Sequence, residues 1–414
     1  MNREQLARLL AAATVLLVLC VAALFGWRQQ ASLPELAGVD PQQWEERFPQ
    51  HYRSYLRTAE DYGRTAHGGS EAYDRLAENP FRRRAFAGNS FAVEYNAARG
   101  HFHAQVDQAR SLRTQEPQPG GCINCHAAEA PALIAELGWE GLHALDYDDL
   151  RERVHHGSSC SACHDPIDMS LVLTRPALIN ALEAQDIDVA ALGRQELRGL
   201  VCAQCHVEYY LSAEGALLTF PWSEGRRLED IEAWYDAIGF SDWIHPESGA
   251  ALLKVQHPET ELYGTGVHAA LKVTCADCHM PTVVAEGMRI SDHWIRSPLM
   301  QLEAACRACH RRDSSATLRQ RVVDIQDATV DLLHTAEQEI ALLIDAIVAG
   351  QAAGTDPALI ANGQQAHRKS QLRWDFIDAE NSTGFHSSLE ARRLLQEAAM
   401  LARSAREQFP VAAD

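Results

Sequence analysis

The stretch Gly120-Gly-Cys122-Ile-Asn-Cys125-His126 is the first of five segments that share one pattern: two cysteines three positions apart, followed directly by histidine. The other four are Cys160-Ser-Ala-Cys163-His164, Cys202-Ala-Gln-Cys205-His206, Cys275-Ala-Asp-Cys278-His279 and Cys306-Arg-Ala-Cys309-His310. Together they use all of the 11 cysteines except Cys20, which lies near the N-terminus. Composition alone would give roughly 0.01 such matches in this chain, so the pattern is not a coincidence.

This pattern is the attachment motif of c-type haem. Two thiols at this spacing can add to the two vinyl groups of one porphyrin, and the imidazole of the next residue then reaches the iron. Zinc knuckles and disulfides also use closely spaced cysteines, but neither requires a histidine directly after every second cysteine. The sequence therefore predicts five covalent haems, each with its own proximal histidine.

The overall composition excludes several classes of protein. The chain has 414 residues, of which 46% are hydrophobic and 22% charged, and 37 Lys+Arg against 56 Asp+Glu give a formal net charge of -19. Such a composition is that of a globular protein, not of a disordered polymer or a multi-span membrane protein. The acidic balance also argues against a basic nucleic-acid-binding protein, and no nucleic-acid partner is expected.

The N-terminal segment indicates export. Residues 9–27 form an apolar run without a charge, close to the roughly 20 residues that span a bilayer. Arg3 and Arg8 precede this run, which places the rest of the chain on the extracytoplasmic, or periplasmic, side. No small-residue cleavage site closes the run, which favours a single uncleaved anchor over a removed signal peptide. Cys20 follows Leu19 rather than a small residue, so we interpret it as an apolar side chain and not as a lipidation site.

The positions of the motifs divide the chain into three parts. We expect an anchor or signal peptide at residues 1–28, a pentahaem catalytic region at 29–315 and a haem-free C-terminal region at 316–414. No Pro/Gly/Ser-rich linker separates the last two, so we expect one structural unit whose apolar core is supplied largely by porphyrins. The predicted fold class is mainly α, a multihaem cytochrome c with little strand, a haem-packed core and long C-terminal helices.

The C-terminal region shows a helical period. Apolar residues recur at three- and four-residue steps from Leu318 to Ile347, Ser314 or Ser315 can cap the start, and Gly350 is expected just beyond the end. A second helix is predicted to begin at Asp356-Pro357. A third is predicted to begin at Ser387, where Glu390 completes a capping-box pattern, and to run to the neighbourhood of Pro410. Apolar stripes of this length are typical of a core or of a dimer seam.

Several short segments between and around the motifs share their order with a known family. They are Tyr95-Asn96, Arg99-Gly100-His101, Ser111-Leu112-Arg113-Thr114, Glu208-Tyr209-Tyr210, Phe220-Pro-Trp222, Phe240-Ser-Asp-Trp243, Lys254-Val-Gln256-His257-Pro258, Gly266-Val-His268, Ser291-Asp-His293, Arg373-Trp374-Asp375 and Gly384-Phe-His386. In this series the chain resembles the pentahaem cytochrome c nitrite reductases, which form ammonia. The resemblance covers about residues 45 to 408.

The resemblance implies a distal ligand for four of the five haems. It assigns His293 to the second haem in chain order, His101 to the third, His386 to the fourth and His268 to the fifth. His103 is the main rival of His101, and His155 and His156 also lie near haem motifs. The first haem, held by Cys122 and Cys125, is left with an open distal position, which marks it as the candidate reaction site.

The chain departs from the family pattern at this same haem. Most members place lysine after the second cysteine of the first motif, whereas this chain has His126. Lysine and imidazole donate differently to iron, so the change is expected to affect rate and reduction potential without closing the distal position.

The resemblance also implies the catalytic residues, which are Arg113, Tyr209 and His257. Arg113 would hold the oxygen atoms of nitrite, while Tyr209 and His257 would assist protonation as the N–O bonds break. Taken singly, each residue has a simpler reading, in which Arg113 pairs with a haem propionate, Tyr209 belongs to the core and His257 ligates iron.

A calcium site is expected beside this pocket. The side chains of Glu208 and Gln256 offer oxygen ligands, and Tyr209 and Lys254 can add backbone carbonyls, which together make the oxygen shell that Ca²⁺ prefers. The role of the Lys254 carbonyl is implied only by the resemblance. Glu208 alone would be read as half of an ordinary ion pair.

The sequence thus predicts an oxidoreductase that reduces nitrite to ammonium with six electrons, delivered through four bis-histidine haems. Hydroxylamine is expected as a further substrate, with sulfite a weaker one. The alternatives are a pure electron-transfer cytochrome with a six-coordinate first haem, and a hydroxylamine-oxidising enzyme. By resemblance, the partners are a second copy of the chain in a homodimer and a membrane quinol-oxidising multihaem cytochrome, or another cytochrome, as the electron donor.

Overall fold

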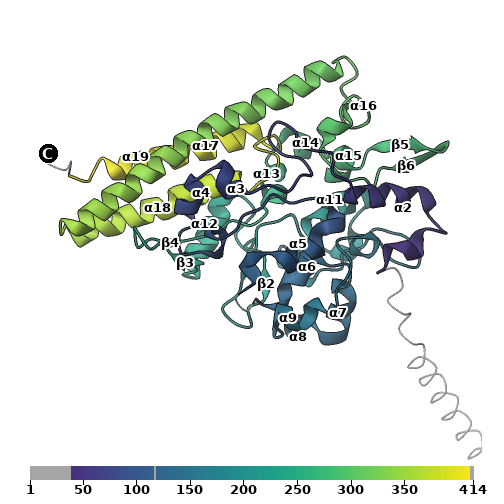
Figure 1. Cartoon of the computed structure of the whole chain (residues 1–414), viewed down its shortest axis with the longest axis horizontal. Coiled ribbons are helices and arrows are strands. Elements are labelled where there is room, and N and C mark those ends of the chain that lie inside the picture. The colour runs from purple at the N-terminus through teal and green to yellow at the C-terminus, as the bar shows by residue number, and fades with distance from the viewer. Residues whose placement is uncertain (1–38, 116–117, 411–414) are drawn as a thin grey trace, which may run out of the picture.

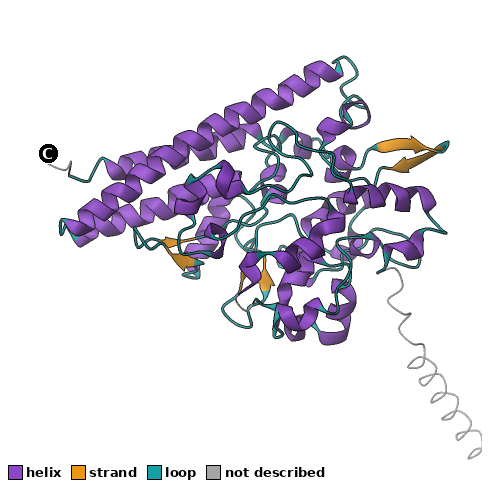
Figure 2. Cartoon of the chain, in the orientation of Figure 1, coloured by secondary structure: helices purple, strands orange, loops and turns teal. Residues whose placement is uncertain are grey.

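The structure, a computed structural model, describes residues 39–115 and 118–410. Within these ranges the chain is mainly helical, which confirms the predicted fold class, and strands occur only in three short hairpins (Figure 2). The predicted anchor at residues 9–27 lies outside the described residues. No helix in the described ranges is both long enough and apolar enough to cross a bilayer.

Short helices joined by long loops make up the part of the molecule that carries the motifs (Figure 1). They are α2 (Pro49–Leu56), α3 (Arg75–Glu78), α4 (Phe81–Ala85), α5 (Ala104–Arg110), α6 (Ile123–His126), α7 (Ala130–Leu137), α8 (Trp139–His143), α9 (Tyr147–Arg151), α10 (Pro176–Glu183), α11 (Arg194–Ala203), α12 (Leu228–Ala237), α13 (Glu259–Gly264), α14 (Val267–Ala270), α15 (Cys275–His279) and α16 (Leu302–Ala305). The antiparallel strand pairs are β1 (Tyr210–Leu211) with β2 (Leu218–Thr219), β3 (Trp243–Ile244) with β4 (Ala251–Leu252), and β5 (Thr282–Ala285) with β6 (Met288–Ser291). Single 3-10 turns fill several of the connections, among them η4 (His101–His103), η5 (Leu112–Gln115), η6 (Gly120–Cys122) and η7 (Cys160–Ala162).

Three long helices form a bundle along one side of the molecule (Figure 1). They are α17 (Ser315–Ala352), α18 (Pro357–Asp378) and α19 (Ser388–Arg406), and each packs against the other two. Ser314 caps α17 by accepting a hydrogen bond from the Thr317 amide at 3.1 Å. Asp356 caps α18 by accepting one from the Ala358 amide at 2.9 Å. The predicted starts of these two helices are therefore confirmed.

The predicted end of the first long helix is wrong, because α17 continues through Gly350 to Ala352. Gly350 is buried inside the helix, and a Cβ atom there would lie 2.9 Å from the ring of Phe409. Gly363 in α18 faces the same ring, at 2.8 Å. The glycine is thus needed for close packing of the two helices around Phe409. The chain reverses instead at Gly354, whose φ of +69° suits glycine.

The predicted capping box at the third long helix is also wrong. Ser387 is the N-cap residue of α19, but its side chain makes no capping hydrogen bond. Glu390 instead accepts hydrogen bonds from Arg393 at 2.7 and 2.9 Å. The Glu390 carboxylate therefore binds the Arg393 guanidinium and does not accept a hydrogen bond from the backbone at the helix start.

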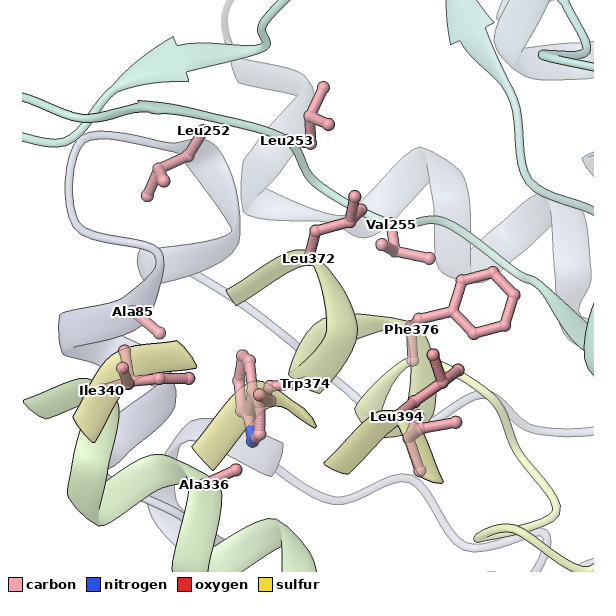
Figure 3. Packing of buried hydrophobic residues seen from close by; sticks show 14 of the residues in the cluster. Ala85, Leu252, Leu253, Val255, Ala336, Ile340, Leu372, Trp374, Phe376 and Leu394 are labelled. Atoms are coloured by element: carbon pink, nitrogen blue, oxygen red, sulfur yellow. The ribbon is translucent and has the colours of Figure 1, made fainter. Parts of the chain in front are cut away.

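The apolar faces of the three helices meet in the largest core of the protein (Figure 3). Ile340 of α17, Trp374 of α18 and Leu394 of α19 are each fully buried there. Leu252 and Val255, from the segment that begins at β4, pack into the same core (Figure 3). Burial of side chains of this size stabilises the fold by about 1.5–3 kcal/mol each.

The haem-free segment before the first motif is tied to the same bundle. Arg82 of α4 donates to the buried carboxylate of Asp378 at the end of α18, with the closest approach at 2.6 Å. Arg84 reaches Asp345 of α17 at 2.6 Å. The N-terminal segment therefore lies against the C-terminal helices, and its following loop carries His101 and Arg113 toward the motif region.

Candidate functional site

One large cavity connects the five motifs. It has a volume of about 2420 Å³, and all ten motif cysteines and all five motif histidines line it. The same cavity is lined by the expected distal ligands and catalytic residues, which are His101, His268, His293, His386, Arg113, Tyr209 and His257. The donor set of thiols and imidazoles along this cavity fits covalently attached haems.

Each motif forms a helical turn, which explains how three residues can bind one haem. The amide of His164 donates to the carbonyl of Cys160, and the amides of His206 and His310 donate to those of Cys202 and Cys306, each at 2.9 Å. Side chains at positions i, i+3 and i+4 of a helical turn lie on the same face. The two thiols and the imidazole therefore point into the cavity together.

Four pairs of imidazoles face one another across the cavity. The ring centroids are 6.2 Å apart for His164 with His293, for His101 with His206 and for His268 with His310, and 6.4 Å apart for His279 with His386. Two imidazoles on opposite sides of one iron, with metal–nitrogen bonds of about 2 Å, would place their centroids roughly 6 Å apart. The spacing of the four pairs fits one iron between each.

The surroundings of His101 and its rival differ. The Nε2 atom of His103 lies 3.1 Å from the carbonyl of Ala59, so a backbone group already engages this ring. His101 has no such partner among the described residues and faces His206. The ring of His257 also lies 6.4 Å from that of His206, on the side toward His126.

Neighbouring motifs contact one another within the cavity. The side chains of Cys205 and Cys125 lie next to each other, which brings the third motif against the first. The side chains of Cys202 and Cys275 also lie next to each other, which brings the third motif against the fourth. The third motif thus stands between the fourth and the first.

The first motif differs from the other four. The Nδ1 atom of its His126 donates to the carbonyl of Ala104 at 3.1 Å, and no other imidazole in the described ranges faces its ring. Two charged side chains act on this ring. Burial lowers the pKa of His126 and the Arg113 guanidinium lowers it further, while the hydrogen bond to Ala104 and the Asp107 carboxylate raise it. The first motif therefore lacks the facing imidazole that the other four have, and the Arg113 guanidinium and the His257 side chain lie near it instead.

The position of Arg113 is fixed by its neighbours. Its Nε donates to the hydroxyl of Ser111 at 3.3 Å, and its guanidinium carbon lies 4.2 Å from the centre of the Phe91 ring. Ser111 in turn donates to Glu94 at 2.7 Å. Among the described residues no carboxylate forms an ion pair with Arg113, so its charge remains available for an anion in the cavity.

Tyr209 and His257 complete the pocket as neutral groups. Burial raises the pKa of Tyr209 well above its ordinary value, so the phenol keeps its proton. Burial lowers the pKa of His257 to about 4, so its imidazole is uncharged near neutral pH. Arg113 is then the fixed cation of the pocket, and the other two are uncharged hydrogen-bonding groups.

The residues expected to bind calcium lie together behind Tyr209. Glu208 accepts a hydrogen bond from the Gln256 amide at 2.6 Å and another from the Tyr235 hydroxyl at 2.9 Å. The side-chain amide of Gln256 donates to the Lys254 carbonyl at 3.1 Å. The side chain of Lys254 points the other way, and its ammonium lies 2.8 and 2.9 Å from the two carboxylate oxygens of Asp375.

The charge balance at this place favours a cation. Burial raises the pKa of Glu208 well above its ordinary value and raises that of Glu261, whose Oε1 accepts from the Glu208 amide at 3.1 Å, to about 8. Neither carboxyl forms an ion pair with a described basic side chain. A divalent cation would supply the missing positive charge, so the oxygen-rich donor set fits Ca²⁺.

Comparison with known proteins identifies the family. Residues 40–413 match the cytochrome c552 family. The chain belongs to the cytochrome c552 family. It is 36% identical over 371 residues to cytochrome c-552 of Parabacteroides distasonis, with 87% of this chain and 75% of the relative covered. It is 34% identical over 399 residues to the cytochrome c nitrite reductase subunit NrfA of Nitratidesulfovibrio vulgaris, with 86% of this chain and 76% of the relative covered.

A solved structure in the family has the same fold. It is the cytochrome c nitrite reductase of Desulfovibrio desulfuricans, with a TM-score of 0.86 and 31% sequence identity, covering 91% of this chain and 88% of that chain. That structure is described as having two calcium sites in its catalytic subunit, NrfA. This confirms the predicted resemblance to the nitrite reductases of the cytochrome c552 family.

Three acidic residues to which the sequence analysis gave no role lie near the residues expected to bind calcium. Asp375 holds the Lys254 side chain, and the buried Glu261 and the exposed Asp242 lie near Glu208. Asp375 stands in one of the family segments, but no spacing rule links it to Lys254, 121 residues away. Glu261 could have been predicted as a residue near the expected calcium site, because it follows His257 by four positions in an acidic helical turn.

Chelation tests the calcium site directly. Because a cation would balance Glu208 and Glu261 and hold Tyr209 through the neighbouring backbone, removal of Ca²⁺ with EGTA is expected to lower both the thermal midpoint and the turnover. Added Ca²⁺ should restore both, and Mg²⁺ should not, since Mg²⁺ demands a tighter octahedral shell. Metal analysis that finds no Ca²⁺ in the active protein, with no response to EGTA, would contradict the assignment.

Proposed function

We propose that this chain reduces nitrite to ammonium at the haem held by Cys122 and Cys125. The observation that carries the proposal is the contrast among the five motifs. Four motif histidines face a second imidazole, while His126 faces none and lies next to Arg113, Tyr209 and His257. An open iron position marks a reaction site, and filled positions mark electron transfer. The membership in the cytochrome c552 family and the similarity to NrfA support the same function.

The overall reaction sets what the protein must supply. Nitrite takes up six electrons and eight protons to give one ammonium ion and two water molecules. When bound, the haems would carry electrons one at a time, and one of them would offer an iron with an open position. The chain must hold the anion, provide protons one at a time and exclude competing ligands.

The pocket residues fit these tasks. The Arg113 guanidinium can hold the nitrite oxygens through charge-assisted hydrogen bonds, and Ser111 and Phe91 keep it in place. Tyr209 and His257 are neutral, so each can donate a hydrogen bond to an oxygen that gains charge as the N–O bond breaks. The contact of His126 with the Ala104 carbonyl leaves its Nε2 atom for the iron and fixes the ring orientation.

The route for electrons follows from the contacts between motifs. The fourth motif touches the third and the third touches the first, so electrons that enter at the other haems would reach the reaction site through the haem held by Cys202 and Cys205. We propose His101, His268, His293 and His386 as the distal ligands of the four carriers.

Haem content and spin state test this proposal most directly. The purified protein should contain five covalent haems by pyridine haemochrome assay, because five complete motifs line one cavity. Electron paramagnetic resonance should show four low-spin haems and one whose signal changes when nitrite is added. Ammonium should be formed when a reduced viologen dye supplies electrons.

Other outcomes distinguish the remaining functions. Five low-spin haem signals that do not change when nitrite is added would support a pure electron-transfer cytochrome and overturn the proposal. Electron release from hydroxylamine to an oxidised acceptor, without nitrite reduction, would support the oxidising enzyme. Turnover of hydroxylamine alongside nitrite is expected, since the same pocket accommodates both.

The expected partners belong to the same proposal. Leu342 and Val348 of α17 and Met400 of α19 are exposed apolar side chains on the long-helix bundle, and we propose that a second copy of the chain covers this surface. A membrane quinol-oxidising multihaem cytochrome, or another cytochrome, is the proposed electron donor on the extracytoplasmic side.

A further inference from the structure

The loop between α18 and α19 presses a carboxylate against one of the proposed haem ligands. The Oε1 atom of Glu380 lies 2.5 Å from the Nδ1 atom of His386. The Glu380 side chain is fully buried, and the contact is a close ion pair: neither atom has a hydrogen-bonding partner in the described part of the chain. The two groups therefore face each other as an isolated pair in a water-poor place.

The loop itself holds this pair in position. The second oxygen of Glu380 accepts from the amide of Ser382 at 3.0 Å and from its hydroxyl at 2.7 Å. The same hydroxyl accepts from the His386 amide at 2.8 Å. Gln326 of α17 donates to the Ser382 carbonyl at 3.0 Å and ties the loop to the bundle. The carboxylate is thus fixed by one oxygen and offers the other to the imidazole.

The other proposed ligands have weaker partners at the same ring nitrogen. The Nδ1 atoms of His126, His164, His279 and His293 lie 2.8 to 3.1 Å from neutral backbone carbonyls. Glu259 approaches the Nδ1 atom of His206, but at 3.7 Å. Among the proposed haem ligands in the described ranges, only His386 has a carboxylate closer than 3 Å to its ring. The haem between His279 and His386 is therefore set apart from the other four.

A buried carboxylate in contact with Nδ1 raises the electron density of the ring by its negative charge and makes Nε2 a stronger donor. A stronger, more anionic axial ligand favours the oxidised iron over the reduced iron. We propose that Glu380 is a positioning residue that lowers the reduction potential of the haem held by Cys275 and Cys278. The inference rests on the proposed role of His386 as a haem ligand and adds a residue that sets the electron affinity of one carrier.

The consequence concerns the direction of electron flow. The fourth motif adjoins the third, which leads to the reaction site at the first. A carrier with a low potential gives its electron up readily to its neighbour. Glu380 would thus keep electrons moving away from the fourth haem toward the Cys202–Cys205 haem.

The test is a redox titration of the fully haem-loaded protein and of Glu380→Gln. Gln has nearly the same size and can still accept from Ser382, but it carries no charge. One of the four low-spin haems should be reduced more easily, with at least a tenfold change in its oxidised-to-reduced ratio at a fixed ambient potential, which is 59 mV for one electron. Its low-spin electron paramagnetic resonance signal should shift as the ligand weakens.

Two further variants serve as controls. Glu380→Asp keeps the charge but withdraws the oxygen, so it should give a smaller shift in the same direction. Glu339→Gln removes a carboxylate that pairs with Arg403 and Arg406 outside the cavity, and it should leave all potentials unchanged. Equal titration curves for the wild type and Glu380→Gln, with five haems attached, would overturn the inference.

A parallel variant separates this inference from the ligand assignment. His386→Ala should turn one low-spin haem high-spin. If all four low-spin signals survive that change, the proposed role of His386 fails and the function proposal must assign another ligand. If one signal is lost but Glu380→Gln leaves the potentials unchanged, only the role of Glu380 fails.

Discussion

Replacement of Arg113 by alanine is expected to reduce nitrite turnover by about 10²-fold or more while all five haems stay attached. The guanidinium is the fixed cation of the pocket, and no described carboxylate pairs with it, so it is free to bind an anion. Its hydrogen bonds to the nitrite oxygens should strengthen as negative charge develops there. Initial rates of ammonium formation with a reduced dye measure the effect, and a haemochrome assay verifies haem content.

Two variants make this experiment specific. Arg113→Lys keeps the charge but loses the planar fork, so an intermediate rate is expected. Arg110→Ala removes an exposed charge three residues before Arg113, at the edge of the same cavity, and should have only a small effect on nitrite turnover. His257→Ala should also slow turnover strongly. Unchanged nitrite reduction in both Arg113→Ala and His257→Ala would remove the proposed roles of both residues.

The substitution Asp375→Asn is expected to lower the free energy of unfolding by about 3–5 kcal/mol, because it leaves a buried ammonium without its counter-charge. Lys254 is 2% exposed, and its Nζ atom contacts Asp375 and the Val255 carbonyl. Burial raises the pKa of Asp375 to about 6 even beside this ammonium, so the two charges do not attract each other strongly overall. The cost of the substitution therefore comes from leaving the Lys254 charge buried without a partner. Urea denaturation followed by circular dichroism of the helices measures the change.

A double variant distinguishes the pair from other causes. Lys254→Met together with Asp375→Asn removes both charges and should recover much of the stability lost in the single variant. Glu286→Gln breaks the exposed pair with Arg53 and should change stability by only about 0–1 kcal/mol. A single Asp375→Asn variant as stable as the wild type would show that Lys254 finds another partner or is neutral.

The sequence predicted the features that depend on local chemistry. The five motifs predicted a haem-lined interior, and the described structure brings all ten motif thiols to one cavity. Ser314 and Asp356 were predicted as helix starts because a cap acts within a few residues of its own position. The family membership and the mainly helical fold were likewise predicted and are confirmed.

The features that the sequence did not predict depend on distant contacts. Gly350 looked like a helix end, but the ring of Phe409 makes it a packing site inside the helix. Glu390 looked like part of a capping box, but Arg393 takes its carboxylate. Glu380 belongs to no sequence motif, and its proposed effect on the haem ligand His386 follows only from the fold of the loop that brings the two side chains together.

The shared cavity has a consequence for how the protein matures in the cell. If one of five porphyrins were missing, the apolar side chains around its motif would lose their packing partner in a cavity of about 2420 Å³. A chain that lacks even one haem is therefore expected to unfold locally and to be cleaved more readily by proteases. The supply of haem would then control how much intact protein accumulates, and intermediate haem contents should be scarce.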